Sequence, residues 1–120
     1  MRGVHFIHSK GILHLDLKPF NIMFANVQDD YNLRIIDFGL AEQLEENSNH
    51  VVSLERTERI LVKLILVYSQ VMSMCGTLEY MSPEVMDCKH ASRASDMWGV
   101  GVIAYLLVSG GVSPFWGGNR

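Results

Sequence analysis

Two short polar motifs constrain this chain more than any other feature. Residues 14–21 read His-Leu-Asp-Leu-Lys-Pro-Phe-Asn, which brings a carboxylate (Asp16), a cation (Lys18) and an amide (Asn21) into one loop. Residues 37–39 read Asp-Phe-Gly and place a second carboxylate beside a glycine, directly after a strand-like apolar run. Two carboxylates and an amide on loops at strand ends are suited to holding Mg²⁺ together with a polyphosphate.

Short periodic runs predict the elements around these motifs. Residues 1–10 have the apolar spacing of the end of a helix, and Gly11 is a C-terminal stop signal. Short strands separated by a polar turn are expected next, with strands at residues 12–15, 21–24 and 33–36 and the turn at 28–32. Both motifs should therefore lie at the edges of a small β-ribbon, which can hold them close together.

Residues 95–109 are apolar nearly all round, which predicts a buried core helix. The stretch is too short to span a membrane, so no membrane partner is expected. A net charge of −3 gives no basic field, so no nucleic-acid partner is expected either. Cys75 and Cys88 occur without a signal peptide, which favours a reducing, cytoplasmic location.

Two further motifs complete an ordered set of four. Residues 75–84 read Cys-Gly-Thr-Leu-Glu-Tyr-Met-Ser-Pro-Glu, and residues 95–101 read Ser-Asp-Met-Trp-Gly-Val-Gly. In this order the four motifs resemble the catalytic loop, metal-binding loop, activation-segment end and central helix of protein kinases. The resemblance implies an α+β, protein-kinase-like fold over residues 1–120. The expected part is a partial C-terminal lobe, mainly α with a small β-ribbon at the catalytic loop.

The resemblance also implies roles in transfer of the ATP γ-phosphoryl group. Asp16 would accept the proton of the substrate hydroxyl or orient that hydroxyl, and Lys18 would neutralise charge on the transferred group. Asn21 and Asp37 would hold Mg²⁺, with Asp37 bridging the metal to the β- and γ-phosphates. Met23 resembles the side chain that packs beneath the adenine. A lysine at position 18 is typical of the serine/threonine class.

Three more residues receive positioning roles from the same resemblance. Thr77 would contact the catalytic loop and help to place a Ser/Thr substrate. Asp96 would accept hydrogen bonds from backbone amides near His14 and so brace that loop. The arginine that normally pairs with Glu84 lies beyond this chain, so the Glu84 carboxylate is expected to be left open.

Each of these residues also has a plain structural interpretation. Asp16 and Lys18 could form a surface ion pair, worth under about 1 kcal/mol. Asn21 and Asp37 could be turn residues, which both residue types favour. Met23 could fill the core. The ordered set of four motifs favours the kinase interpretation.

The residues of these motifs most resemble those of calcium/calmodulin-regulated kinases, in the branch of myosin light chain kinase and titin. Residues 7–19 and 107–110 carry this likeness. Leu15 stands where many kinases have an arginine that pairs with a phosphate, so activation by phosphorylation is not expected. The branch implies calmodulin as a partner through an inhibitory tail absent here, protein Ser/Thr as substrate, and association with the cytoskeleton.

The resemblance begins at the catalytic loop, and no glycine-rich loop or strand lysine precedes it. The expected function is therefore a serine/threonine protein kinase present as a truncated fragment, inactive alone because both lobes position ATP. The alternative is a non-catalytic, pseudokinase-like interaction module or a gene-model remnant.

Residues 51–70 lengthen the activation segment beyond the usual size and are predicted to be an insertion foreign to the family. The segment starts with Val, whose codons begin GT, and ends in Tyr-Ser-Gln, which a pyrimidine-rich stretch ending CAG can encode. Those are intron boundary signals. The alternative is a genuine helix, since its leucines and isoleucines can form an apolar stripe.

Overall fold

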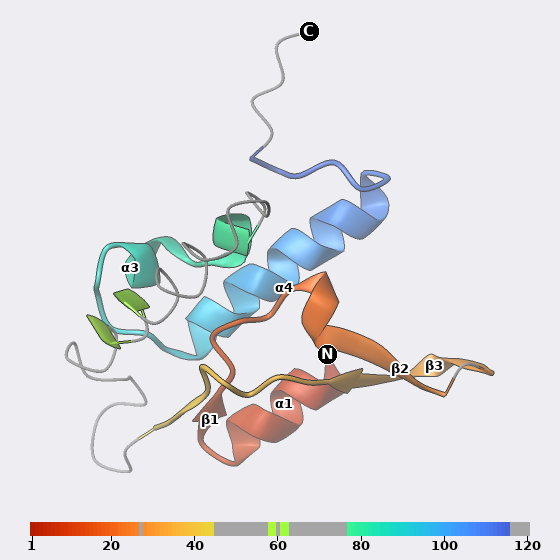
Figure 1. Cartoon of the computed structure of the whole chain (residues 1–120), viewed down its shortest axis with the longest axis horizontal. Coiled ribbons are helices and arrows are strands. Elements are labelled where there is room, and N and C mark those ends of the chain that lie inside the picture. Colours follow the sequence, from red (N-terminus) through yellow and green to blue (C-terminus); the bar gives the residue numbers. More distant parts are fainter. Residues whose placement is uncertain (27, 45–57, 60, 63–76, 116–120) are drawn as a thin grey trace, which may run out of the picture.

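The computed structural model describes residues 1–26, 28–44, 58–59, 61–62 and 77–115 (Figure 1). Its helices and strands combine with two short 3₁₀ turns, η1 and η2. In chain order these are α1 (Arg2–Ser9), β1 (Ile12–Leu13), η1 (Pro19–Asn21), β2 (Ile22–Asn26), β3 (Asp29–Ile35), β4 (Glu42–Gln43), η2 (Thr77–Tyr80), α3 (Pro83–Met86) and α4 (Arg93–Val108). Helices with small antiparallel sheets make the α+β content that the sequence predicts.

Helix α1 is amphipathic. Val4 and Ile7 are buried, whereas Phe6 on the opposite side is 62% exposed. The helix ends at Ser9, two residues before Gly11, which has a φ of 68° and donates its N–H to His8 O at 3.1 Å. A glycine adopts this left-handed conformation without steric cost, so Gly11 ends the helix as predicted.

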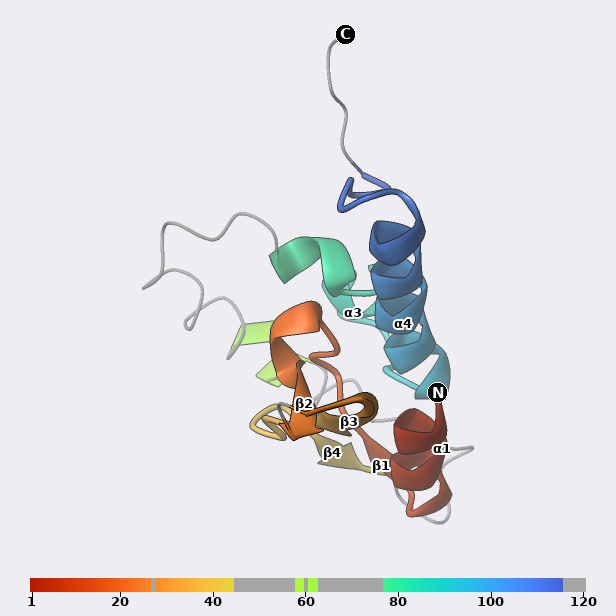
Figure 2. The same cartoon turned by 90° about the vertical axis from the view of Figure 1, so that its right-hand side faces the viewer.

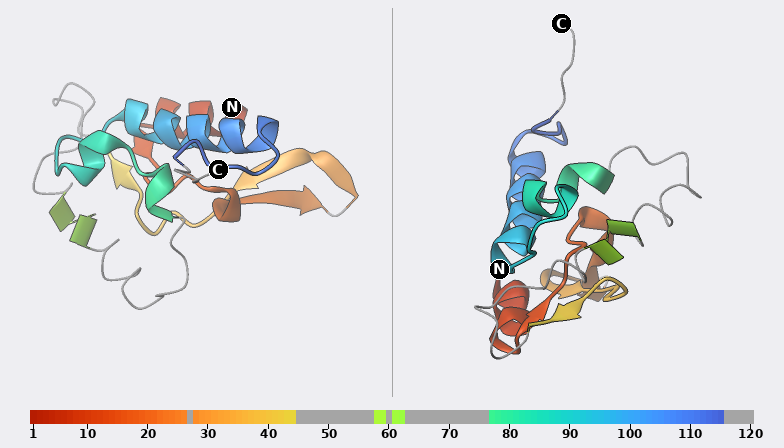
Figure 3. Two further views of the ribbon diagram at one scale, coloured as in Figure 1. Left: turned by 90° about the horizontal axis from the view of Figure 1, so that it is seen from above. Right: turned by 90° about the vertical axis from the view of Figure 1, so that its left-hand side faces the viewer.

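The strands form two separate two-stranded sheets, where the sequence predicted a single ribbon. β2 and β3 form an antiparallel hairpin with Ile22 opposite Ile35, and it projects from the body of the molecule (Figure 3). β1 pairs instead with β4. Residues 29–32, predicted as the turn, belong to β3 because Asn26 already pairs with Asp29. The expected strand at 12–15 stops at Leu13.

Helix α4 starts at Arg93, two residues before the predicted start, because Ser92 and Ser95 form a capping box. Its buried positions repeat at helical spacing on one face: Ser95, Asp96, Gly99 and Val102. Helix α4 lies along one edge of the fold (Figure 2). Its other face is apolar too, yet Leu107 and Val108 are 79% and 84% exposed. The prediction of a core helix is thus met on one face only. No helix in the described ranges is long and apolar enough to cross a membrane.

A small hydrophobic core lies where β1, β4 and α3 meet. It consists of Leu13, Leu44, Met81, Val85 and Ala91. Partly buried side chains packed against this cluster include Leu15 and Leu61.

The predicted insertion at 51–70 falls mostly outside the described residues. Within it, residues 58–59 and 61–62 are helical. Leu61 packs against the core cluster, whereas Val62 is 56% exposed. The foreign origin of the segment stays a prediction.

Helix α4 approaches two other segments closely at Gly99. A Cβ added there would lie 2.8 Å from the carbonyl oxygen of Leu17 and 3.4 Å from that of Tyr80. Residue 17 belongs to the first polar motif and residue 80 ends η2, so three segments distant in sequence meet at one helix position. Only a glycine permits this contact without a backbone shift.

We therefore expect Gly99→Ala to destabilise the protein by about 1–3 kcal/mol, because the new methyl group overpacks against backbone that cannot rotate away. Gly101→Ala is the matched control, since a Cβ at that position of the same helix meets nothing within 4 Å. The control should stabilise by about 0.5–1 kcal/mol through helix propensity. Urea unfolding of the two variants measures both effects, and equal signs would contradict the proposed contact.

Candidate functional site

The Asp16 carboxylate is the centre of a compact polar cluster. Its Oδ2 accepts hydrogen bonds from Lys18 Nζ at 2.8 Å and from Asn21 Nδ2 at 3.0 Å. Asn21 Nδ2 also donates to the Asp16 carbonyl oxygen at 2.8 Å. The side chains of Asp16 and Lys18 are only 11% and 14% exposed, and Asn21 is buried. The arrangement is therefore neither a surface ion pair nor a simple turn.

His14 joins the first polar motif to the second. Its ring is fully buried; Nδ1 accepts from the Asp16 N–H at 3.3 Å, and Nε2 donates to Ile36 O at 3.0 Å. These roles assign the neutral tautomer with the proton on Nε2. The Ile36 N–H in turn donates to Asn21 O at 2.9 Å. The residue before Asp37 is thus fixed to both ends of the first motif.

Asp37 stands at the exposed rim of this cluster. Its φ of 59° lies in the left-handed region, which Asp tolerates better than most residues. Its Oδ1 accepts the Gly39 N–H at 3.2 Å, which stabilises the turn. The neighbouring Phe38 ring meets the His14 ring edge-on, with centroids 4.8 Å apart. The carboxylate therefore remains open to solvent while the adjoining backbone is held against the first motif.

Asp96 supports the loop from beneath. The side chain is 1% exposed, and Oδ2 accepts the His14 N–H at 2.9 Å while Oδ1 accepts the Leu15 N–H at 2.7 Å. These are the amides that the sequence resemblance assigned to it. Leu15 has a φ of 63°, a left-handed conformation that costs about 1–3 kcal/mol in a residue of this kind. The Asp96 carboxylate holds Leu15 in that conformation.

Sequence reasoning missed His8 as part of this support. His8 Nε2 donates to Asp96 Oδ2 at 2.7 Å, so the buried carboxylate receives three donors. The Arg93 guanidinium also donates to the His8 carbonyl oxygen at 3.2 Å, which further ties α1 to α4. The position of His8 in the helix could have indicated this role. His8 shares the inward face of its helix with Val4, and a polar side chain on a buried face requires a hydrogen-bond partner.

The expectation of an open Glu84 carboxylate was wrong. Ser95 Oγ donates to Glu84 Oε1 at 2.7 Å while accepting the Ser92 N–H at 3.1 Å. Partial burial raises the pKa of Glu84, but the Ser95 hydrogen bond, the backbone and the charge of Lys89 together lower it below its ordinary value. Ser95, the third helical residue of the α4 capping box, thus provides the partner that the sequence did not reveal.

The two remaining predicted site residues lie outside this cluster. Met23 lies on β2, opposite Arg34 of β3. It is 53% exposed, so it does not fill the core. Thr77 begins η2, and its side chain lies outside the described part of the chain.

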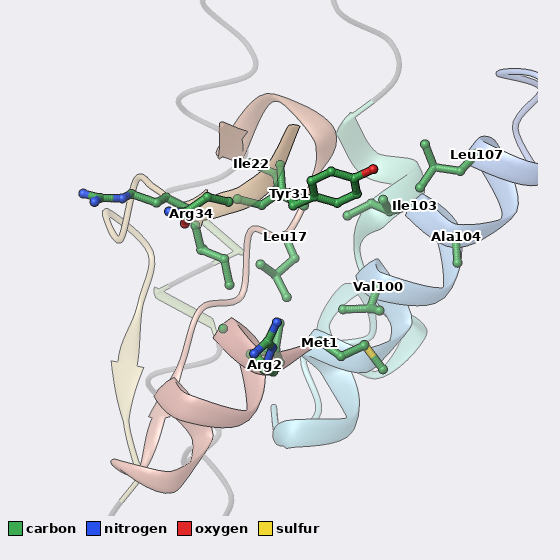
Figure 4. Close-up of a pocket in the computed structure, with 15 residues that line it drawn as sticks. Met1, Arg2, Leu17, Ile22, Tyr31, Arg34, Val100, Ile103, Ala104 and Leu107 are labelled. Atoms are coloured by element: carbon green, nitrogen blue, oxygen red, sulfur yellow. The ribbon is translucent and has the colours of Figure 1, made fainter. Parts of the chain in front are cut away.

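A groove of about 850 Å³ lies between α1, the β2–β3 hairpin and α4 (Figure 4). Its lining includes Tyr31, Val100 and Leu107, together with Leu17 and Ile22 from the segment that flanks the polar cluster. Asp16 and Asn21 do not line it. The groove is mostly apolar, although Arg2, Asn32 and Arg34 also line it, and it adjoins the candidate site at Leu17.

The polar cluster provides oxygen ligands that suit Mg²⁺. The Asn21 amide has its nitrogen turned to Asp16, and its other end is a carbonyl oxygen; Asp37 is an exposed carboxylate. Within the described ranges, no group of three or more His, Cys, Asp or Glu side chains could hold a metal ion by itself.

Comparison with known proteins identifies the family. The family model described as "protein kinase domain" matches residues 1–120. This chain belongs to the protein kinase domain family. It is 40% identical over 117 residues to smooth muscle myosin light chain kinase from Gallus gallus, covering 98% of this chain and 5% of that protein. It is 40% identical over 118 residues to death-associated protein kinase dapk-1 from Caenorhabditis elegans, covering 98% and 7%.

A third relative is serine/threonine-protein kinase 17A from Oryctolagus cuniculus, 35% identical over 120 residues, which are 100% of this chain and 25% of that protein. The chain thus spans a quarter or less of the length of these relatives. The predicted kinase group, and the likeness to myosin light chain kinase within it, are confirmed.

We expect Asp96→Asn to loosen the loop that holds Asp16. An amide has one acceptor oxygen and an NH₂ group, so in either orientation a buried N–H of His14 or Leu15 loses its acceptor, at about 1–3 kcal/mol. Hydrogen exchange should accelerate at these two amides, and urea unfolding should show the lost stability. Asp87→Asn is the matched control, because Asp87 is an exposed partner of Lys89 and should change stability by under about 0.5 kcal/mol. Unchanged exchange at both amides would refute the bracing role.

We expect Ser95→Ala to raise the pKa of Glu84 toward its ordinary value, since it removes the hydroxyl donor. A carboxyl whose folded pKa is lowered contributes stability above its unfolded pKa and loses it as the pH falls through the folded pKa. The acid-induced loss of stability below about pH 4.5 should therefore be smaller in the variant. NMR titration of Glu84 measures the shift. Ser109→Ala, at the other end of α4, is the control and should leave the titration unchanged.

Proposed function

We propose that residues 1–120 are the part of a serine/threonine protein kinase domain that carries the catalytic and metal-binding loops, in its C-terminal lobe. The observation that carries the proposal is the Asp16 carboxylate bonded to Lys18 and Asn21, with Asp37 fixed beside them through Ile36. A buried base, a cation and two oxygen ligands for a metal are the groups that phosphoryl transfer from ATP requires.

In this proposal Asp16 accepts the proton of a substrate Ser or Thr hydroxyl. Lys18 and Asn21 donate to Oδ2 of that carboxylate and so fix its orientation toward the hydroxyl. The Lys18 ammonium also offsets negative charge on the transferred phosphoryl group. Asn21 and Asp37 would hold Mg²⁺, which supplies charge neutralisation at the phosphates of ATP. Met23, exposed on β2, would lie under the adenine.

Regulation by a calmodulin-binding tail is part of the proposal. Its support is the sequence resemblance to calcium/calmodulin-regulated kinases. Leu15, whose apolar side chain packs against the core cluster and cannot pair with a phosphate, argues only against activation by phosphorylation. A loop held by packing does not need phosphorylation to become ordered.

A non-catalytic interaction module is the second candidate. The exposed apolar face of α4, with Leu107 and Val108 open to solvent in the described structure, favours it. In that case the Asp16 cluster would serve stability alone, so substitution of Asp16 distinguishes the two functions.

In the native full-length protein we expect Asp16→Ala to lower kcat for Ser/Thr peptide phosphorylation by about 10²–10⁴-fold, because the base is lost while ATP binding is nearly unchanged. Asp37→Ala should abolish transfer and weaken Mg·ATP binding. Kinase assays with labelled ATP and calorimetric ATP titration measure both. Asp87→Ala, at an exposed carboxylate, is the control. Equal loss of ATP affinity in the Asp16 and Asp37 variants would refute the assigned roles.

A further inference from the structure

Leu61 is a partly buried side chain within the extra segment, residues 51–70. It packs against the core cluster, whereas the adjacent Val62 is 56% exposed. Glu58 and Arg59 are exposed as well. Residues 58–59 and 61–62 are helical, and successive residues of a helix point about 100° apart. One side of these residues therefore faces the core and another faces solvent, as in a segment that is docked on the fold.

The sequence around Leu61 continues the apolar side. Leucines occur seven residues before it and three residues after it, at positions 54 and 64, and an isoleucine occurs four residues after it, at position 65. Residues at these spacings share one face of a helix. The extra segment thus has the residue pattern of an apolar stripe suited to covering a hydrophobic surface, and Leu61 belongs to that stripe.

The surface that Leu61 covers joins the two ends of the chain between the second and third motifs. Leu44, which follows β4, and Met81, which follows η2, are both members of the core cluster. Leu40, which directly follows the second motif, packs against the same cluster. A contact at Leu61 divides the connection between Leu44 and Met81 near its middle. It therefore replaces one long loop by two shorter ones, which have fewer conformations open to them.

We propose that Leu61 is the anchor of an internal docking element, through which the extra segment binds the core cluster and holds β4 and α3 together. The segment is then a structural element of this protein, even though it is foreign to the family, and it is not the product of a retained intron. A stretch with no place in the fold would leave its leucines and isoleucines exposed. The inference goes beyond the proposed function and does not depend on phosphoryl transfer, because it concerns only how the chain between the motifs is held.

The test uses the native full-length protein. Leu61→Asp places a charge on the apolar contact, and Val62→Asp, the matched control, places the same charge on the exposed neighbour. Trypsin cleavage after Arg59 measures release of the segment and should be about tenfold faster in Leu61→Asp. Hydrogen exchange at the Leu44 amide, which donates to Gly11 O at 2.7 Å, should accelerate by a similar factor. The control should match the wild type in both measurements.

Two further variants keep the inference testable if Leu61→Asp does not fold. Leu61→Ala removes most of the contact without adding a charge and should change both rates in the same direction. Deletion of residues 51–70 should uncover the core cluster, which increased fluorescence of the dye ANS reports. Equal cleavage and exchange rates in Leu61→Ala and wild type would overturn the inference. So would a deletion variant that binds no more ANS than the wild type and unfolds at the same urea concentration.

Discussion

The geometry of the site depends on one buried carboxylate. Asp96 is nearly inaccessible to solvent, and a buried charge is tolerated only where donors surround it. Its three donors come from α1 and from the backbone of the loop after β1, so one side chain on α4 connects all three segments. The same helix presents Gly99 to the Leu17 carbonyl three residues further on. The loop that carries Asp16 therefore rests on α4 at two successive points of one face.

Hydrogen bonds to the backbone of Ile36 connect that loop to the second motif. Ile36 exchanges hydrogen bonds with His14 and Asn21, and none of these depends on the Asp37 carboxylate itself. The Asp37 carboxylate is thus not needed for the hydrogen bonds that join the two motifs. Asp37 can remain exposed at the rim, because its neighbour holds the chain in place.

Sequence reasoning predicted the parts of this arrangement that local pattern determines. Helix α1 with its Gly11 stop, the β2–β3 hairpin and the composition of the polar cluster all follow from short runs of residues. The partners of His8 and Glu84 could not be predicted, because those contacts join residues 88 and 11 positions apart. The pairing of β1 with β4 was missed for the same reason: a two-residue strand has no periodicity that indicates its neighbour. The cytoplasmic location stays a prediction.

Two residues in the left-handed region flank the cluster, and they are stabilised in different ways. The side chain of Asp37 stabilises the left-handed backbone of that residue, since its carboxylate accepts the Gly39 N–H within the same turn. Leu15 has no such side-chain acceptor. Its conformation is maintained by the bond of its N–H to Asp96 and by packing of its side chain against the core cluster. Both supports persist without a bound ligand or an added charge. Contacts within the folded core therefore offset the backbone strain at Leu15, next to Asp16. We infer that the loop takes its shape when the protein folds and does not need phosphorylation to complete it.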